Sequence, residues 1–280
     1  MESHSIFLYH AGMPQPSASF LDGSTRLHFI VGDPIAQVKS PGGVSQAFLD
    51  AGLNALCLPA HVSAQDLSAW FQGISLARNV DGIIVTVPHK LACLDLCATA
   101  SERARFVGAV NTLRRNADGS WHGDMFDGEG FVQALLSAGG KLAGRSALLV
   151  GAGGAGSAIA HAFVLAGVSR LAIHDPDGAR RSSLVARLAA LGRGQVQHGS
   201  ADPTGFDVVI NASPMGMRPG DPLPIEADKL HASQFAGCVI TQPAVSPWLQ
   251  AARDRGCRSM NGADMFAQVR DLMVGFLLGR

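Results

Sequence analysis

The segment VGAGGAG, residues 150–156, limits the folds open to this chain more than any other feature. Gly151, Gly153 and Gly156 have the G-x-G-x-x-G spacing, directly after the apolar run 146–150 and at the start of a helix-like stretch. In a dinucleotide-binding fold the first glycine permits a tight turn, the second lets the pyrophosphate approach the backbone, and the third lets helix and strand pack closely. The free N–H groups of the helix N-terminus then face the phosphates. The predicted cofactor-binding residues of this loop are Gly151, Gly153, Gly154, Ala155 and Gly156.

An acidic residue ends the next predicted strand. Asp175 closes residues 170–175, where a dinucleotide fold places the acid that binds the ribose. Its carboxylate accepts hydrogen bonds from ribose hydroxyls and repels a 2′-phosphate, whereas the nearby Arg180 and Arg181 suit a phosphate. We therefore expect NAD as the preferred cofactor, with NADP open and Arg180 as a second cofactor contact. Alternatively, Asp175 only caps the helix that begins near Gly178.

Apolar runs and helix-like stretches alternate along the rest of the chain, which predicts an α/β fold with a mostly parallel sheet. The first part has predicted strands at 27–32, 55–60 and 81–87 and predicted helices at 40–50, 63–74 and 88–96. Asp118-Gly119 predicts the turn of a hairpin within 109–124. The second part has predicted strands at 146–150, 170–175 and 206–213 and predicted helices at 128–140, 154–166, 179–191, 247–255 and 263–278.

The length of 280 residues exceeds the usual size of one domain, so we expect two domains. The first is a mixed α/β domain of residues 1–126, to which residues 238–280 return. The second is a Rossmann-type domain of residues 127–237.

Composition narrows the possible partners. Lysine plus arginine and aspartate plus glutamate both number 22, so the chain has no electrostatic footprint for nucleic acid or an acidic membrane surface. The five cysteines form no C-x-x-C pair, which favours buried thiols in a reducing cytoplasm and no metal site. The apolar stretch 146–168 could be mistaken for a membrane span, but its glycines favour a strand, a turn and a helix.

The N-terminus has no signal-peptide pattern, and residues 1–25 are expected to form a loose extension. We expect a cytoplasmic monomer or homodimer that acts on a small molecule.

The segment VTVPHK, residues 85–90, ends an apolar strand in a proline and a lysine. Proline stops the strand ladder, so Lys90 is expected at the carboxyl edge of the sheet, where ligands of α/β proteins bind. Taken alone, Lys90 would be interpreted as a solvated residue at a helix start. The neighbouring His89 is interpreted as a surface residue rather than a second base.

Six motifs occur in an order that resembles the shikimate dehydrogenase family, from about residue 27 to the C-terminus. They are GDPIAQVKSP (32–41), GIIVTVPHK (82–90), GAVNT (108–112), GDMFDG (123–128), GAGGAG (151–156) and NASPMGM (211–217). The resemblance implies an N-terminal substrate-binding and catalytic domain for a hydroxylated cyclohexene carboxylate, a second domain for NAD(P), and a cleft between the two domains that holds the substrate. It also implies an enzyme of aromatic amino acid biosynthesis that interconverts a ring hydroxyl and a ketone.

The same resemblance assigns roles to individual residues. It implies that Lys90 is the catalytic acid/base and that Asp127 is its partner, with the position of the shared proton open. The substrate-binding residues that it implies are Ser40, Thr86, Asn111 and Gln268. The motif NASPMGM adds Asn211 and Met215 to the cofactor site.

Several positions depart from the family pattern and leave the substrate open. Val38 replaces the first of two carboxylate-binding serines, Met125 and Phe126 replace two polar residues near Asp127, and Thr241 replaces a tyrosine. Gln268 falls one residue early on its helix, which turns its side chain by roughly 100°, and Val269 takes the usual place. The substrate could therefore be shikimate or a relative of it. A nucleotide-sensing regulator that has lost the chemistry is the alternative.

Overall fold

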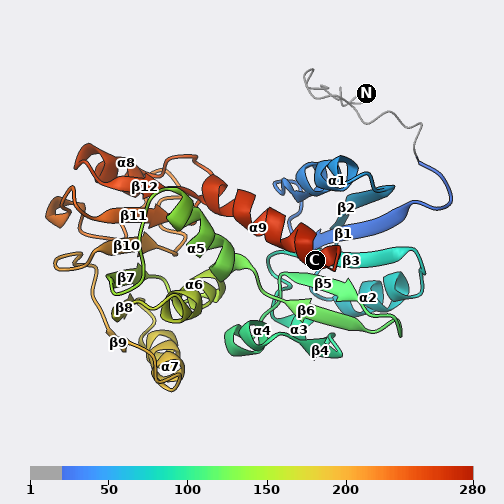
Figure 1. Cartoon of the computed structure of the whole chain (residues 1–280), viewed down its shortest axis with the longest axis horizontal. Coiled ribbons are helices and arrows are strands. Elements are labelled where there is room, and N and C mark those ends of the chain that lie inside the picture. The colour runs from blue at the N-terminus through green and yellow to red at the C-terminus, as the bar shows by residue number, and fades with distance from the viewer. Residues whose placement is uncertain (1–20, 280) are drawn as a thin grey trace, which may run out of the picture.

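The computed structural model describes residues 21–279, which form two six-stranded sheets. Figure 1 shows the sheets in two lobes, with helix α9 (Gly262–Leu277) running between them. The predicted α/β fold with two sheet-based units is confirmed. Most of the extension expected for residues 1–25 lies outside the described residues.

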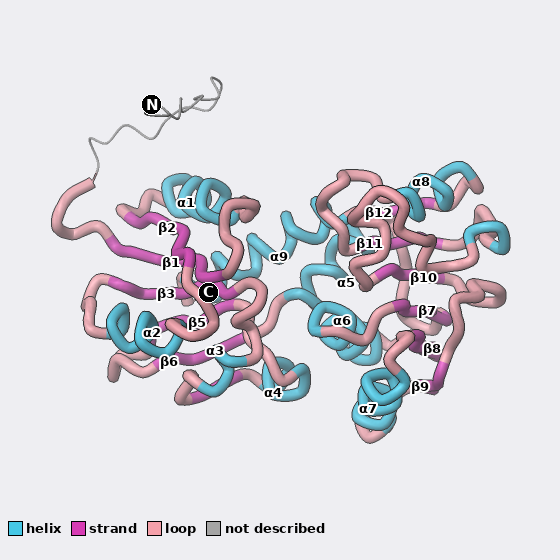
Figure 2. The backbone as a smooth tube through the Cα atoms, turned by 180° about the vertical axis from the view of Figure 1, so that it is seen from behind, coloured by secondary structure: helices cyan, strands magenta, loops and turns pink. Residues whose placement is uncertain are grey.

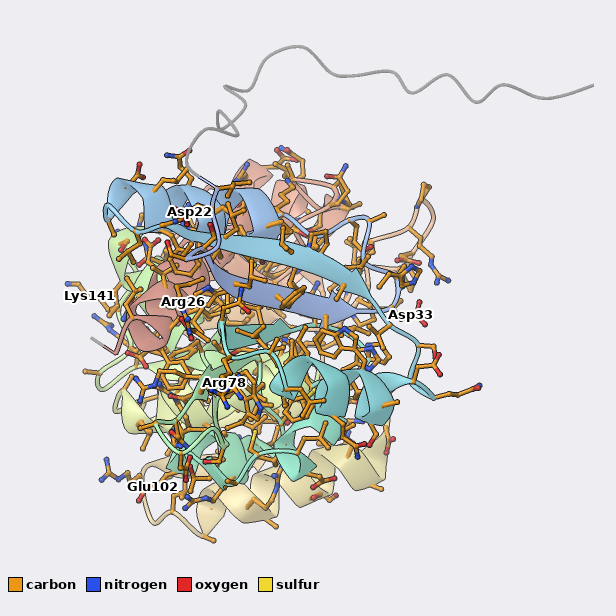
Figure 3. All side chains as sticks on the ribbon, turned by 90° about the vertical axis from the view of Figure 1, so that its right-hand side faces the viewer. Asp22, Arg26, Asp33, Arg78, Glu102 and Lys141 are labelled. Atoms are coloured by element: carbon orange, nitrogen blue, oxygen red, sulfur yellow. The ribbon has the colours of Figure 1, made fainter. Side chains whose placement is uncertain are left out.

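The first lobe contains a mixed sheet. Its strands are β1 (Arg26–Gly32), β2 (Ala55–His61), β3 (Val80–Val85), β4 (Thr99–Ala100), β5 (Thr112–Arg115) and β6 (Trp121–Asp124). In the order β2-β1-β3-β5-β6-β4, β1 runs parallel to both of its neighbours, and β5 and β6 form the predicted antiparallel hairpin. At the hairpin turn Gly119 has a φ of 86°, which favours glycine. Figure 3 shows Arg26 and Asp33 toward opposite ends of β1, so Asp33 marks the carboxyl edge of this sheet.

Four helices belong to the first lobe: α1 (Ser40–Asp50), α2 (Leu67–Ser75), α3 (Ala92–Asp95) and α4 (Glu102–Val107). α1 begins and ends where the sequence predicts, with proline in its first turn. The segment after β3 differs from the prediction. The strand ends at Val85, the N–H of His89 donates to the carbonyl of Thr86 at 3.0 Å in a turn, and α3 has four residues. The predicted helix would bury Leu91, but this side chain is 66% exposed. Burial of Leu91 therefore does not favour a helix that begins before Ala92.

The second lobe contains a parallel sheet in the order β12-β11-β10-β7-β8-β9. Its strands are β7 (Ser146–Val150), β8 (Arg170–His174), β9 (Gln195–His198), β10 (Val208–Asn211), β11 (Phe235–Cys238) and β12 (Arg258–Met260). Its helices are α5 (Asp127–Ser137), α6 (Gly154–Leu165), α7 (Gly178–Ala189), the 3₁₀ turn η2 (Ala227–Lys229) and α8 (Pro247–Asp254). The predicted strands and helices of this part agree with the structure to within a few residues.

Two helices connect the lobes. Figure 2, viewed from behind, shows α5 and α9 in the region between the two sheets. They pack so closely that a Cβ added to Gly130 would lie 2.4 Å from Val269 Cγ2. The predicted boundaries of the two domains stay a prediction, with one exception. The chain does not return to the first unit at residue 238. β12 pairs with β11 in the second sheet, and α9 is the later element that contacts α1, β3 and β5.

Among residues 21–279, no helix is long and apolar enough to cross a membrane, and no His, Cys, Asp or Glu side chains cluster as a metal site. All five cysteines are free. Four of them are buried, as the sequence predicts, and Cys97 is half-buried.

Candidate active site

A cavity of about 280 Å³ lies at the carboxyl edge of the first sheet, beside the ends of β1 and β3. This edge is where α/β proteins bind ligands. The polar residues that line the cavity are Gln37, Lys39, Ser40, Thr86, Lys90, Asn111, Asp127 and Thr241. Its apolar lining includes Val38 and, from α9, Phe266, Val269 and Met273. Among these residues Gln37, Lys39, Phe266 and Met273 were not singled out from the sequence.

Lys90, Asp127 and Asn111 form one hydrogen-bonded group in the cavity. Lys90 Nζ donates to Asp127 Oδ2 at 2.6 Å, and the Asn111 amide donates to Asp127 Oδ1 at 2.8 Å. The side chain of Asp127 is 9% exposed and that of Lys90 is 24% exposed. Both carboxylate oxygens are therefore held in place, while the ammonium group still reaches the cavity. This arrangement can take a proton from a bound hydroxyl or return one to it.

The backbone fixes both members of the pair. The carbonyl of Lys90 accepts from the N–H of Val110 at 2.9 Å, which ties the turn after β3 to the start of β5. Asp127 is the first residue of α5, where the helix dipole favours a negative charge. The N–H of Phe126 donates to Asn111 Oδ1 at 3.1 Å, so Asn111 is bound to the segment that carries Asp127.

Arg103 and Asp124 form a second charged group, next to the segment that leads to Asp127. Arg103 donates to Asp124 Oδ1 at 2.7 Å and to Oδ2 at 2.8 Å, and the N–H of Met125 donates to Oδ1 at 2.7 Å. Burial raises the pKa of the Asp124 carboxyl, but the hydrogen bonds from Arg103 and Ser101 outweigh burial, so the pKa is lowered. Asp124 is thus held ionised three residues before Asp127, and no separate feature of the sequence signalled this role.

Not all of the expected substrate contacts lie in the cavity. Ser40, Thr86 and Asn111 line it, but Gln268 does not, and Val269 lines it instead. The shift of one residue along α9 explains the difference, because it turns the side chain to another side of the helix.

The departures from the family pattern also divide into two groups. Val38 and Thr241 line the cavity. Met125 and Phe126 do not, because both side chains are buried in the surrounding core, where Phe126 packs 5.4 Å from the ring of Phe276. These two replacements therefore change the packing around Asp127 rather than the wall that faces a ligand.

The interpretation of His89 as a surface residue is wrong. Its side chain is 2% exposed, and Nε2 lies 2.8 Å from the carbonyl oxygen of Val62, to which it can donate a hydrogen bond. His89 is not part of the cavity lining. Its burial follows from the turn after β3, which directs it toward the core of the first lobe.

The glycine loop has the spatial properties that a pyrophosphate needs. Gly151 has a φ of 107°, and a Cβ added to Gly156 would lie 1.9 Å from the carbonyl oxygen of Gly151, so helix and strand require glycine there. A Cβ added to Gly153 or Gly154 would meet no atom within 4 Å. The space above the N-terminus of α6 is therefore open, and the loop, including Ala155, fits a dinucleotide.

Asp175 and Arg180 lie beside this loop. Asp175 Oδ2 accepts from the N–H of Ala152 at 2.7 Å and Oδ1 accepts from the N–H of Asp177 at 2.9 Å, so Asp175 shapes the loop directly. Asp175 does not cap α7, because the N-cap is Asp177, whose side chain accepts from the N–H of Arg180. The Arg180 guanidinium lies 3.7 Å from Asp175 and 3.4 Å from Asp177.

Asn211 and Met215 belong to the loop after β10. The Asn211 amide donates to the Met215 carbonyl at 3.1 Å, and Asn211 Oδ1 accepts from Ser213 Oγ at 2.6 Å. A Cβ added to Gly151 would lie 2.7 Å from the carbonyl carbon of Ala212. This loop therefore packs directly against the glycine loop.

Comparison with protein-family models gives one match. Residues 30–113 match the model described as the shikimate dehydrogenase substrate binding domain, and this range contains Lys39, Ser40, Thr86, Lys90 and Asn111.

Known proteins resemble the chain over most of its length. A shikimate dehydrogenase (NADP(+)) of Rubrobacter xylanophilus is 38% identical, with 86% of this chain and 87% of the relative covered. The structure of shikimate 5-dehydrogenase from Listeria monocytogenes in complex with shikimate and NAD has a TM-score of 0.85 at 27% identity, covering 93% of this chain and 94% of the other. The ligand-free 5-ketofructose reductase of Gluconobacter sp. has a TM-score of 0.83 at 29% identity, covering 91% and 94%.

Proposed function

The chain belongs to the shikimate dehydrogenase family, and from this membership we propose that it interconverts a ring hydroxyl and a ketone. The substrate class is shikimate or a related hydroxylated cyclohexene or cyclohexane carboxylate, and the co-substrate is a nicotinamide dinucleotide. The observation that carries the proposal is the Lys90–Asp127 pair, with its 2.6 Å contact, in a cavity at the edge of the first sheet.

The residues that line the cavity have separate roles in the proposed reaction. Oxidation of a secondary alcohol removes a hydride from carbon and a proton from oxygen, and a bound nicotinamide supplies the hydride exchange. Lys90 Nζ takes the hydroxyl proton in oxidation and returns it to the carbonyl oxygen in reduction. Asp127, held by Asn111, stabilises the ammonium form of Lys90. Thr86 and the second N–H of the Asn111 amide bind ring hydroxyls, and Ser40 binds the carboxylate.

A substrate panel tests the reaction. Shikimate, quinate and neutral ring alcohols are each incubated with NAD or NADP, and the absorbance of the reduced cofactor is followed. We expect turnover with at least one of the two acids. Tight dinucleotide binding without turnover of any of these compounds would instead favour the nucleotide-sensing regulator, which has no chemical need for the Lys90–Asp127 pair.

The charges beside the glycine loop support NAD as the preferred co-substrate. A 2′-phosphate near Asp175 would meet two carboxylates, those of Asp175 and Asp177, and the neighbouring Arg180 already pairs with both. The named relative from Rubrobacter uses NADP(+), so this preference would distinguish the chain from that relative. We expect a preference of at least about tenfold in kcat/KM, equivalent to about 1.4 kcal/mol.

Two substitutions with opposite expected effects test this preference. Asp175→Asn removes a negative charge and should shrink the NAD preference, although weaker support of the Ala152 N–H should lower the affinity for both cofactors. Arg180→Met removes the cation and should increase the preference. Measuring kcat/KM with both cofactors separates these effects. Equal use of NAD and NADP by the unaltered enzyme would contradict the proposed preference.

A further inference from the structure

We propose that the ammonium group of Lys39 binds the carboxylate of the substrate, so that the cavity selects acids with one negative charge. The proposal rests on the proposed function and adds a specificity-determining residue to it. Lys39 lines the same cavity as Lys90 and Asp127, and it directly precedes Ser40 in the chain.

The charges of the cavity lining leave one positive charge unbalanced. Lys90 is paired with Asp127 at 2.6 Å. Within residues 21–279, by contrast, no carboxylate lies within 4.0 Å of the Lys39 ammonium group. Lys39, Lys90 and Asp127 are the charged residues of the lining, so the cavity has a net charge of plus one when Lys90 is in its ammonium form. A ligand with a single negative charge complements it.

The order of the strands places Lys39 and Lys90 in connections that leave the same edge of the first sheet. Lys39 follows β1 and Lys90 follows β3, and these strands are neighbours, with Val31 opposite Val85. The ring can therefore place its carboxylate toward the connection after β1 and its reacting hydroxyl at Lys90.

The start of α1 leaves Lys39 free for this contact. Lys39 is the N-cap residue, but its side chain makes no capping hydrogen bond, so the ammonium group is not needed to begin the helix. The eleven-residue helix adds partial positive charge at the same end of the cavity, and the hydroxyl of the buried Ser40 lies beside it.

Val38 explains why a cation is needed there. It lines the cavity at the position where the resemblance implies a serine, and its side chain donates no hydrogen bond. Hydrogen bonds between ionised groups are stronger than those between neutral groups. A salt bridge from Lys39 can thus replace the missing hydroxyl and hold the carboxylate together with Ser40.

Kinetics with shikimate and with its neutral methyl ester separate recognition of the carboxylate from other effects of a substitution on the cavity. Lys39→Met keeps most of the side-chain length and removes the charge. We expect the KM for shikimate to rise about 10- to 100-fold, the value of a charge-assisted hydrogen bond. The value of kcat should stay within about twofold, because the contact is the same in the ground and transition states. The KM for the methyl ester of shikimate, which is neutral, should be unchanged by the substitution.

Two further variants serve as controls. Arg270→Met removes a positive charge near α1 that is outside the cavity lining, where Arg270 Cδ lies 3.3 Å from a Cβ added to Gly43, and it should leave the KM unchanged. Val38→Ser combined with Lys39→Met restores a hydroxyl and should recover part of the affinity for shikimate. An equal rise in KM for the acid and the ester, or an equal effect of Arg270→Met, would overturn the role of Lys39.

Calorimetric titration of shikimate without cofactor distinguishes this proposal from the proposed function. If the unaltered protein binds shikimate but oxidises neither shikimate nor any other compound of the substrate panel, and Lys39→Met abolishes the binding, the proposed function fails and the role of Lys39 stands. If turnover occurs and Lys39→Met changes neither binding nor KM, the role of Lys39 fails and the proposed function stands. A protein that neither binds nor oxidises any ring acid overturns both.

Discussion

Lys90 and Asp127 are 37 residues apart in the sequence, yet Nζ and Oδ2 lie 2.6 Å apart. The sequence could suggest this contact only through the order of six motifs, because no local spacing brings the two residues together.

The direction in which individual side chains point was predicted less well. His89 follows a proline and carries a polar ring, so it resembled a surface residue, but tertiary packing buries it against Val62. Gln268 likewise lies outside the cavity, because its direction depends on how α9 is rotated.

A buried histidine should make the stability of the protein depend on pH. His28 in β1 is 3% exposed, its ring lies 4.4 Å from that of Phe48, and burial lowers its pKa to about 4. The unfolded chain, with a pKa near 6.5, therefore binds more protons than the folded protein between about pH 4 and pH 6.5. The free energy of unfolding should be independent of His28 above about pH 6.5. It should fall by roughly 3 kcal/mol as the pH drops to about 4.

Urea unfolding of the unaltered protein and of His28→Leu between pH 4.5 and pH 7.5 measures this contribution. Because other groups titrate in both proteins, the difference between the two curves isolates His28. His122, which is partly exposed, provides a control through His122→Leu. The same pH dependence in His28→Leu and in the unaltered protein would show that His28 does not cause the acid sensitivity.

Among the structural elements, the glycine loop was predicted in most detail. Its requirements are local, since one glycine has a positive φ and another touches the preceding turn. Elements that depend on tertiary pairing were not predicted. β9 has the polar sequence QVQH and forms an edge strand by pairing with β8, and β12 has three residues that pair with β11. α3 is shorter than predicted, and Leu91, at the start of the predicted apolar pattern, is exposed.

The packing of α6 against β7 makes a prediction for two neighbouring glycines. Gly156→Ala would place Cβ 1.9 Å from the carbonyl oxygen of Gly151, so it should lower the free energy of unfolding by about 1–3 kcal/mol. Gly154→Ala meets no atom within 4 Å and should leave stability equal or higher by up to about 1 kcal/mol. Denaturant unfolding of both variants without cofactor measures these changes in the free energy of unfolding. Equal stability of the two variants would mean that the third glycine is not required for packing.

The helices α5 and α9 connect the cavity with the second sheet. α5 begins with Asp127, and α9 carries Val269, which lines the cavity and packs on Gly130 of α5. The alternation of strands and helices predicted two units, but it did not show that β12 stays in the second sheet before α9 reaches the first. That crossing depends on contacts between segments far apart in the sequence.

The contact between these helices yields a matched pair of substitutions. Gly130→Ala would bring Cβ to 2.4 Å from Val269 Cγ2 and 2.9 Å from the Val269 nitrogen, so we expect a loss of about 1–3 kcal/mol in stability. Because Val269 would move, the KM for the substrate should rise as well. Gly275→Ala, on an open position of α9, should stabilise the protein by about 0.5–1 kcal/mol without changing the KM. A stabilising effect of Gly130→Ala would contradict the close packing of α5 and α9.

Lys90 is assigned the transfer of the proton of the reacting hydroxyl, and the turnover of Lys90→Met with shikimate and NAD measures how far the reaction depends on it. We expect kcat to fall by about 10²- to 10⁴-fold, the usual contribution of a general acid/base, while the affinity for NAD stays unchanged. Lys141→Met, at an exposed lysine outside the cavity lining, should keep the kcat of the unaltered enzyme. A Lys90→Met enzyme whose kcat stays within about tenfold of the unaltered value would contradict the assignment.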